Sequence, residues 1–446
     1  MRDRRRCSTT KSSRLERYSR IENGVGNFKS AIIYQVIEQH AAEIAFLWLL
    51  HDSVIHATQY NLADLTRLDN RIDAHIDGVR IAGEGGWEIC NKGLSQGSAG
   101  EIFAIAVLAF ESEDNDHIET VLDAGTVSLE LCRGLISAIG WISYAEAERH
   151  VRQLLNGSPP ALRRIGIAAS AIHRRDPGQP LVDALDDDDL LLRARALRAV
   201  GELGRKDLLS SVQRNLTSED EECRFSAAWS GALLGNPNSV PVLKAIAGLD
   251  VPYNEEAATL AFRRIDLPAA LRWQRELAQN SETARLAVIG AGASGDPTLV
   301  PWLIEQMKTP ELARVAGESF TMVTGVDIAY EDLEREWPQG FESGPTENPE
   351  DENVEMDPDE NLPWPNPELI QKWWHNHRNN FQNGTRYLIG KPITEDWLQQ
   401  VLRIGEQRQR AAAALELVLK RPGQPLFEVR APGFRQQQML GLKVTR

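Results

Sequence analysis

The hydrophobic positions in the middle of the chain repeat at an interval of about 30 residues. Each repeat has an Ala-rich stretch with helical periodicity, then a turn, then a short stretch rich in Leu and Val. Two of the turns are nearly identical, reading GNPNSVPVL at 235–243 and GDPTLVPWL at 295–303. Asp or Asn before Pro ends one helix and begins the next. The pattern therefore predicts a helix, a tight turn and a second helix in every repeat.

Seven such units can be placed between residues 98 and 326. Five are clear, two weaker units precede them at Glu101 and Cys132, and a degenerate last helix follows near Glu311. One helix pair cannot bury its apolar face alone, so the pairs must stack. The sequence therefore predicts an all-α fold, an α-solenoid with helical regions at both ends. In the five clear units the first helices are expected near residues 163, 193, 224, 255 and 285, and the second helices near 180, 208, 240, 268 and 300.

The regions on either side of the array also have helical patterns. Residues 28–97 predict a helical hairpin that ends in the glycine-rich sequence GEGG at 83–86. In residues 363–446, Asn366 before a proline is typical of a helix N-cap. A second helix is expected there from about Thr394 to residue 419. We expect these two regions to cover the ends of the array.

Charge is distributed unevenly along the chain, whose formal net charge is −15 at pH 7. Residues 327–360 contain fourteen acids and only one basic residue, Arg335, so we expect 327–362 to be an acidic disordered linker. The first twenty residues carry eight Lys or Arg against two acids, and residues 1–27 are expected to be a disordered basic tail. The body of the chain is mildly acidic, which argues against nucleic acid as a partner.

Apolar runs and cysteines narrow the class of protein further. The longest unbroken apolar run, Ile102 to Phe110, is far shorter than the roughly 20 residues of a membrane-spanning helix, so no membrane association is expected. The four cysteines lie far apart, without the spacing of a zinc site or a disulfide framework. A reducing cytoplasm is the expected location.

Two sets of residues are candidates for binding a partner. The first is the run WWHNHR at 373–378, in which Trp373, Trp374, His377 and Arg378 are the candidates. Its two histidines are two positions apart and face opposite sides of a helix, so they do not form a metal clamp. The run is better explained if a tryptophan packs this helix onto the array, although Trp and Arg are also frequent at interfaces.

The second set is a recurring arginine at the start of the first helices, namely Arg193, Arg224 and Arg285. An arginine that recurs in this way usually pairs with an acid of the neighbouring repeat. A stripe that binds phosphate or acidic groups is the alternative.

No catalytic residues, metal site or cofactor are expected from the remaining polar residues. His40 and His75 could meet across the N-terminal hairpin as structural histidines, and a metal there would need Asp52, Asp69 or Asp73 nearby. The acids at 186–189 lie between two predicted helices, where they are expected to cap a helix N-terminus.

The repeat pattern resembles the HEAT-like repeat superfamily, in the short form of about 30 residues that bilin lyases contain. The resemblance implies a solenoid of HEAT-like helix-turn-helix repeats. The di-iron hydroxylases of this superfamily carry His-Glu dipeptides in successive repeats, and this sequence has none. That reaction class is therefore not expected.

The flanking motifs are more specific than the repeats. EQHAAEIAFLWLLHD, LTRLDNRIDAHIDGVRIAGEGGWE, LPWPNPELIQKWWHNHRNNF and RYLIGKP are similar to motifs of a bacterial family of HEAT-repeat proteins. The likeness extends from about residue 30 to the C-terminus. Members of that family are often encoded beside components of the type VI secretion system, a contractile toxin injector.

These observations lead us to expect a non-enzymatic scaffold or adaptor whose inner helices present a curved surface to a protein partner. The resemblance implies that this partner is a type VI effector or spike component. Two alternatives stay open: an immunity-type inhibitor whose acidic linker covers a basic toxin site, and an enzyme such as a lyase.

Overall fold

The computed structural model describes residues 33–112, 114–344 and 356–444, so the expected basic tail lies outside the described residues. Regular structure in these ranges is helical apart from strands β1 (Tyr387–Leu388) and β2 (Lys391–Pro392), which pair antiparallel, and two isolated bridges. Among the described residues, no helix has the length and apolar character that crossing a membrane requires.

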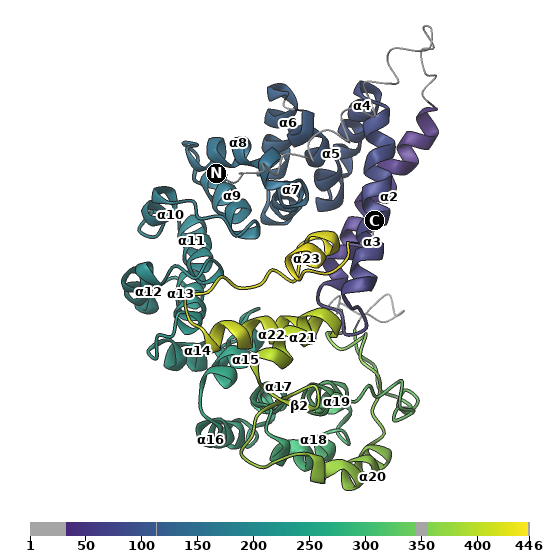
Figure 1. Ribbon diagram of the computed structural model, residues 1–446, viewed down its shortest axis with the longest axis vertical. Coiled ribbons are helices and arrows are strands. Elements are labelled where there is room, and N and C mark those ends of the chain that lie inside the picture. The colour runs from purple at the N-terminus through teal and green to yellow at the C-terminus, as the bar shows by residue number, and fades with distance from the viewer. Residues whose placement is uncertain (1–32, 113, 345–355, 445–446) are drawn as a thin grey trace, which may run out of the picture.

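The seven predicted helix pairs are all present, which confirms the solenoid (Figure 1). The helix expected near Glu311 is a regular helix of 15 residues, α19 (Pro310–Thr324), rather than a degenerate one. The first helices of the pairs are α5 (Ala99–Ser112), α7 (Leu129–Trp141), α9 (Pro160–Ile172), α11 (Leu190–Glu202), α13 (Glu221–Leu233), α15 (Asn254–Arg264) and α17 (Ala284–Ser294). The second helices are α6 (Asn115–Gly125), α8 (Tyr144–Leu155), α10 (Gln179–Ala184), α12 (Leu209–Arg214), α14 (Ser239–Ala247), α16 (Leu267–Leu277) and α18 (Val300–Gln306). Short 3-10 helices are η1 (Leu94–Gln96), η2 (Lys206–Leu208), η3 (Asn215–Thr217), η4 (Ser281–Thr283), η5 (Pro297–Leu299) and η6 (Arg378–Asn380).

Small side chains let the first helices stack closely. A Cβ on Gly134 would lie 2.1 Å from the carbonyl oxygen of Ala99, so only glycine allows α7 to approach α5 this closely. Ser230 of α13 donates a 2.6 Å hydrogen bond to the carbonyl oxygen of Leu197 in α11. The Ala-rich and Gly-rich composition of these helices therefore reflects backbone-to-backbone packing.

Aspartates cap several helices of the array. Asp189 accepts a 2.8 Å hydrogen bond from the backbone N–H of Leu192, which confirms the capping role predicted for the acids at 186–189. Asp220 and Asp266 do the same for α13 and α16. Each satisfies a backbone donor that the first turn of a helix leaves free.

The N-terminal region contains one helix more than the predicted hairpin. After α2 (Tyr34–Val54) and α3 (Leu62–Ile81), the sequence GEGG begins α4 (Glu84–Gly93) instead of ending the unit. Gly83 has φ +55° and turns the chain into this helix. Trp87, Ile89 and Cys90 then become buried, and this burial stabilises the additional helix.

The acidic segment was expected to be disordered, but its described parts, 327–344 and 356–362, form defined contacts. Residues 345–355 lie outside the described ranges. Arg314 of α19 forms an ion pair of 2.7 Å with Asp357. The same guanidinium lies over the ring of Trp364, with 4.8 Å between its Cζ and the ring centroid. Cationic and aromatic side chains thus hold acidic residues on the array.

The C-terminal region contains α20 (Pro367–His377), the two strands, α21 (Glu395–Ile404), α22 (Gln407–Lys420) and α23 (Gly433–Met439). Asn366 caps α20 as predicted, and Thr394 caps α21, but the single helix expected from Thr394 to residue 419 is wrong. The chain breaks at Glu406, where Gln409 accepts a 3.1 Å hydrogen bond from the backbone N–H. This capping box begins a new helix.

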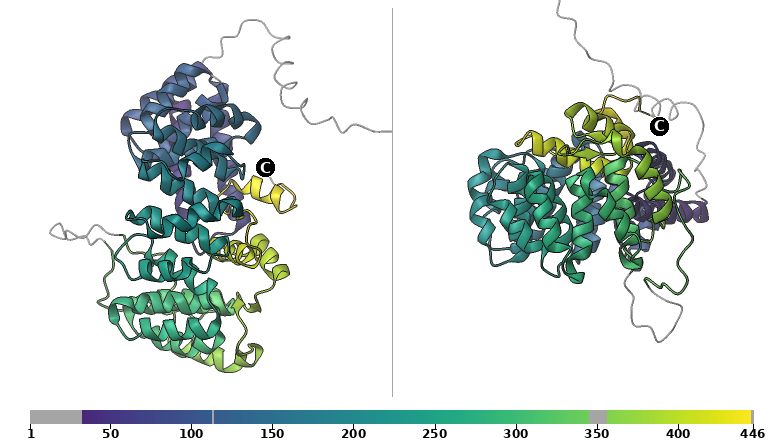
Figure 2. Two further views of the ribbon diagram at one scale, coloured as in Figure 1. Left: turned by 90° about the vertical axis from the view of Figure 1, so that its left-hand side faces the viewer. Right: turned by 90° about the horizontal axis from the view of Figure 1, so that it is seen from below.

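The array curves as an arc, and the C-terminal helices α21, α22 and α23 lie inside it (Figures 1 and 2). Helix α23 packs on α3, and the backbone N–H of Gln407 donates a 2.7 Å hydrogen bond to the carbonyl oxygen of Tyr60. The chain therefore returns from the far end of the array to its N-terminal hairpin. Part of the concave surface is covered by the protein itself.

Candidate functional site

A pocket of about 740 Å³ lies on the concave side of the array. Its floor is formed by α7, α9, α11 and α13, and one side is formed by α2. The segment 424–432, which connects α22 to α23 and which we call the strap, lines the pocket beside α2 through Glu428, Arg430, Ala431 and Pro432. We call this cavity the strap pocket.

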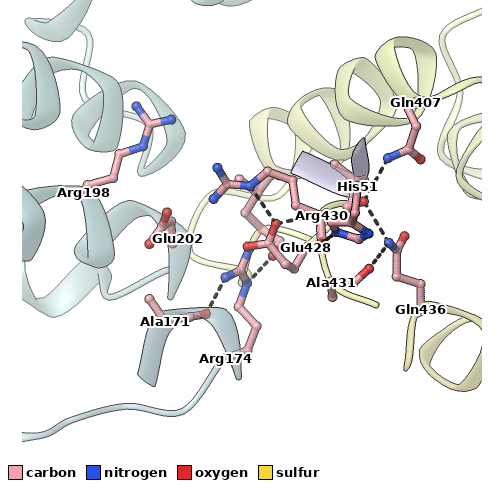
Figure 3. Close-up of polar contacts among 12 residues, drawn as sticks. His51, Ala171, Arg174, Arg198, Glu202, Gln407, Glu428, Arg430, Ala431 and Gln436 are labelled. Carbon is pink, nitrogen blue, oxygen red and sulfur yellow. Dashed lines mark hydrogen bonds and ion pairs between the residues drawn. The ribbon is translucent and has the colours of Figure 1, made fainter. Parts of the chain in front are cut away.

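The strap is held on the array by backbone and charge contacts (Figure 3). Arg174 donates a 2.5 Å hydrogen bond to the carbonyl oxygen of Leu426, whose N–H donates a 2.9 Å bond to the carbonyl oxygen of Glu202. The Glu428 carboxylate is bound by Arg174 at 3.1 Å and by Arg430 at 3.2 Å. Burial alone would raise the pKa of Glu428, but the two guanidinium groups outweigh it and lower the pKa to about 2. Glu428 is therefore ionised at neutral pH.

His51 joins the N-terminal hairpin to the C-terminal region. Its Nδ1 lies 2.6 Å from Oδ1 of Asp69, and the other oxygen of Asp69 accepts a 2.6 Å hydrogen bond from the N–H of Gly433. Burial lowers the pKa of His51, but the charge and hydrogen bond of Asp69 more than offset it, so the pKa is raised. A protonated His51 also donates from Nε2 to the carbonyl oxygen of Arg430 at 3.4 Å.

Three arginines line the strap pocket at intervals of 31 residues: Arg133 on α7, Arg164 on α9 and Arg195 on α11. We call them the arginine row. Arg133 pairs with Asp52, and Arg195 lies 2.9 Å from Glu202. Arg164, between them, contacts only the thiol of Cys132, at 3.7 Å, within the described residues. The sequence interpretation missed this row, although its period of 31 residues is visible in the sequence.

Apolar side chains line the pocket between these charges. They come from four first helices and are Ile136, Ala168, Ile172, Leu191, Ala194 and Phe225. Phe225 stacks on Tyr253 with 4.4 Å between ring centroids. Charged groups beside aliphatic and aromatic groups are the composition of a protein-binding surface. The pocket can therefore recognise both a charge and a neighbouring apolar group.

Of the recurring arginines singled out in the sequence, none lines the strap pocket. Arg193 and Arg224 donate to backbone oxygens six residues earlier, on Asp187 and Ser218. Only Arg285 forms the expected pair with an acid of the neighbouring repeat, Glu255 at 2.6 Å, and it also binds Asp359 through two hydrogen bonds.

The aromatic run of α20 lies at the other end of the array from α7 (Figure 1). Trp373 packs edge-to-face on Phe320 of α19, with ring centroids 5.6 Å apart. His377 stacks on Trp373, and Trp374 contacts Phe381. The tryptophans thus hold α20 on the array, while Arg378 is exposed at its end.

His40 and His75 meet across the hairpin, with 2.9 Å between their Nδ1 atoms. The three aspartates considered as further ligands are engaged elsewhere, Asp52 by Arg133, Asp69 by His51 and Asp73 by the indole N–H of Trp141. Within the described ranges, no group of three or more His, Cys, Asp or Glu side chains could hold a metal ion.

A smaller pocket, of about 480 Å³, lies between α15, the strands and α22. It contains Glu416, which pairs with Arg263 at 3.0 Å and with Arg386 at 2.6 Å. Arg386 also donates to the carbonyl oxygens of Arg263 and Ser294. These groups join the C-terminal region to the array, so the strap pocket is the better candidate for a binding site.

Comparison with known protein families identifies repeats in the array. The HEAT repeat family matches residues 178–263, from the turn before α10 into α15. No curated protein matches the chain. The matched repeats, with the same helix pairs stacked on both sides of them, make this chain an all-α solenoid of HEAT-like repeats.

Proposed function

We propose that this protein is a non-enzymatic scaffold that binds a protein partner through the strap pocket. HEAT repeats generally mediate protein–protein interaction, and stacked helix pairs offer a curved surface for it. The observation that carries the proposal is the lining of the strap pocket, where the arginine row alternates with aliphatic side chains of successive repeats.

The chemistry of the pocket supports binding rather than catalysis. Burial raises the pKa of the Cys132 thiol, although Arg164 opposes this, so the sulfur is not an activated nucleophile. His51 is held by Asp69 as part of the connection between α2, α3 and the C-terminal region. The polar groups of the site are thus used for structure and recognition.

We further propose that the partner belongs to the type VI secretion system, as an effector or spike component held before loading. The support is the similarity of the flanking motifs to those of the bacterial family described above. Two of these motifs form parts of α2 and α3, and the first of them supplies His51 and Asp52 to the strap pocket. The motifs that resemble the family therefore contribute to the proposed binding site.

Affinity capture with matched variants tests both proposals. Leu191 lines the pocket and is 42% exposed, so Leu191→Trp should obstruct the pocket without preventing folding. Leu249, 39% exposed at the end of α14, allows the control Leu249→Trp outside it.

The tagged full-length protein is incubated with lysate of its native cell at low and at high salt, and bound proteins are identified by mass spectrometry. We expect a partner that is retained by the wild type and by Leu249→Trp but lost with Leu191→Trp. Equal capture by all three would rule out the strap pocket as the site. A captured partner unrelated to type VI secretion would refute that assignment and leave the scaffold role intact.

A further inference from the structure

Arg164 is the member of the arginine row that forms no ion pair with any residue in the described part of the chain. Its neighbours Arg133 and Arg195 are each paired with a carboxylate of the chain. Within the described residues, the contact of Arg164 is with the thiol of Cys132, which is buried and uncharged. A guanidinium presents five donors in a planar fork that matches a carboxylate. Arg164 therefore offers unused donors at the centre of the pocket.

The acids that line the pocket do not supply the missing partner. Asp52 and Glu202 pair with the outer members of the arginine row, Glu256 pairs with Arg198 at 2.6 Å, and Glu428 pairs with two arginines of its own. Glu222, at the start of α13, is exposed and forms no ion pair with any described residue. It affects Arg164 only at longer range, as an opposite charge that lies beyond contact.

The strap shows one way in which the concave surface holds a carboxylate of the chain itself. The backbone of the strap is held through the N–H and the carbonyl oxygen of Leu426. Its one buried carboxylate, on Glu428, is held by arginines. A segment of the chain itself, with one carboxylate among its nine residues, is thus held by arginines beside the arginine row.

We infer that the strap pocket binds an extended acidic segment of the protein partner, and that Arg164 takes one carboxylate of that segment. The residues beside this carboxylate would pack on Ile136, Ala168 and Leu191. A single carboxylate fits better than a phosphate, because the acids lining the pocket repel a second negative charge. This inference rests on the proposed scaffold function.

Selection from a library of random nine-residue peptides displayed on phage tests the inference, with the immobilised full-length protein as bait. The variant is Arg164→Gln, which keeps a polar side chain of similar length without the charge. The control is Arg152→Gln on the outer helix α8, where the exposed Arg152 forms its ion pair with Glu148 one turn earlier on the same helix. Equal thermal unfolding temperatures of the three proteins show that the variants are folded.

We expect the wild type and Arg152→Gln to enrich peptides with Asp or Glu at one fixed position, and Arg164→Gln to lose this enrichment. A synthetic peptide from the wild-type selection should bind about 10-fold more weakly when its acid is changed to the amide, since a charge-assisted hydrogen bond is lost. The same change should have no effect on binding to Arg164→Gln.

A wild-type selection without an acidic position would overturn the inference, and so would the same acidic position with Arg164→Gln. If the wild type enriches apolar peptides without an acid, and Leu191→Trp loses them, the inference is overturned but the scaffold function is supported. A selection that enriches no peptide also overturns it, and capture of the full-length partner then decides the scaffold function separately.

Discussion

Glu428 lies with its carboxylate between two guanidinium groups, and this arrangement makes one residue important for the whole strap. The side chain of Glu428 is buried. One of its two arginine partners, Arg174, comes from the loop after α9, and the other, Arg430, comes from the strap itself. Removing one partner from a buried ion pair is costly, because the remaining charge is left without compensation. A charged residue therefore helps to hold the strap in position.

We predict that Glu428→Gln lowers the free energy of unfolding by about 1 to 3 kcal/mol at pH 7. The range begins as low as this because Arg430 is exposed, and an exposed partner contributes less to the ion pair. The pKa of Glu428 falls from its ordinary value of 4.5 to about 2 on folding. Its contribution is therefore complete above about pH 5 and is lost as the pH falls towards 2. Urea unfolding of both proteins at pH 7 and pH 3 measures this. A difference that stays constant between the two pH values would show that the carboxylate charge has no role.

At the scale of elements, Arg435 of α23 connects the C-terminal region to the end of α7. Its guanidinium donates to the carbonyl oxygens of Gly140, Trp141 and Ile142, at 2.6, 3.2 and 2.9 Å. These are carbonyls that the last turn of a helix leaves unpaired, and a cation there also meets the negative end of the helix dipole. Burial lowers the pKa of Arg435 to about 10, which leaves it charged at neutral pH.

We predict that Arg435→Ala destabilises the protein by about 1 to 2 kcal/mol and loosens α23 before the array. Hydrogen exchange measured by mass spectrometry should then be faster in residues 424–444 and at the end of α7. Exchange in α15 and α17, which Arg435 does not contact, is the internal reference. Uniform acceleration across all helices would mean that Arg435 acts on global stability instead.

The elements that follow from local pattern were predictable, and those that depend on distant contacts were not. The Ala-rich first helices and their aspartate caps follow from residues a few positions apart, as Asp189 and Leu192 show. The strap has no such pattern, because Leu426 is placed by Arg174, 252 positions earlier. The capping box that begins α22 at Glu406 is local, but the packing of this helix start on the N-terminal hairpin depends on Tyr60, whose carbonyl oxygen accepts from the N–H of Gln407. The arginine row was detectable by its period, but an interval cannot show which of its members lacks a partner.

At the scale of the whole molecule, the C-terminal region closes the arc of the solenoid. It contacts the last repeats through β1, the middle repeats through the strap, and the N-terminal hairpin through α23. In a solenoid, each repeat otherwise contacts only its neighbours, so the ends of the arc would move relative to one another. The buried charged groups of His51, Asp69 and Glu428 therefore fix the position of the strap and also the width of the concave side.

Removal of residues 424–446 should open this closed arrangement while leaving the repeats folded. The array keeps its stacked core, so we predict nearly unchanged helical circular dichroism apart from the loss of α23, but a larger radius of gyration in small-angle X-ray scattering. A shorter truncation that removes only residues 443–446 keeps α23 and is the matched control. An unchanged radius after the longer truncation would show that neighbouring repeats alone hold the arc. If the truncated protein also binds the acidic peptide more tightly than the full chain, the strap competes with the partner for the concave surface, because both present a carboxylate to its arginines.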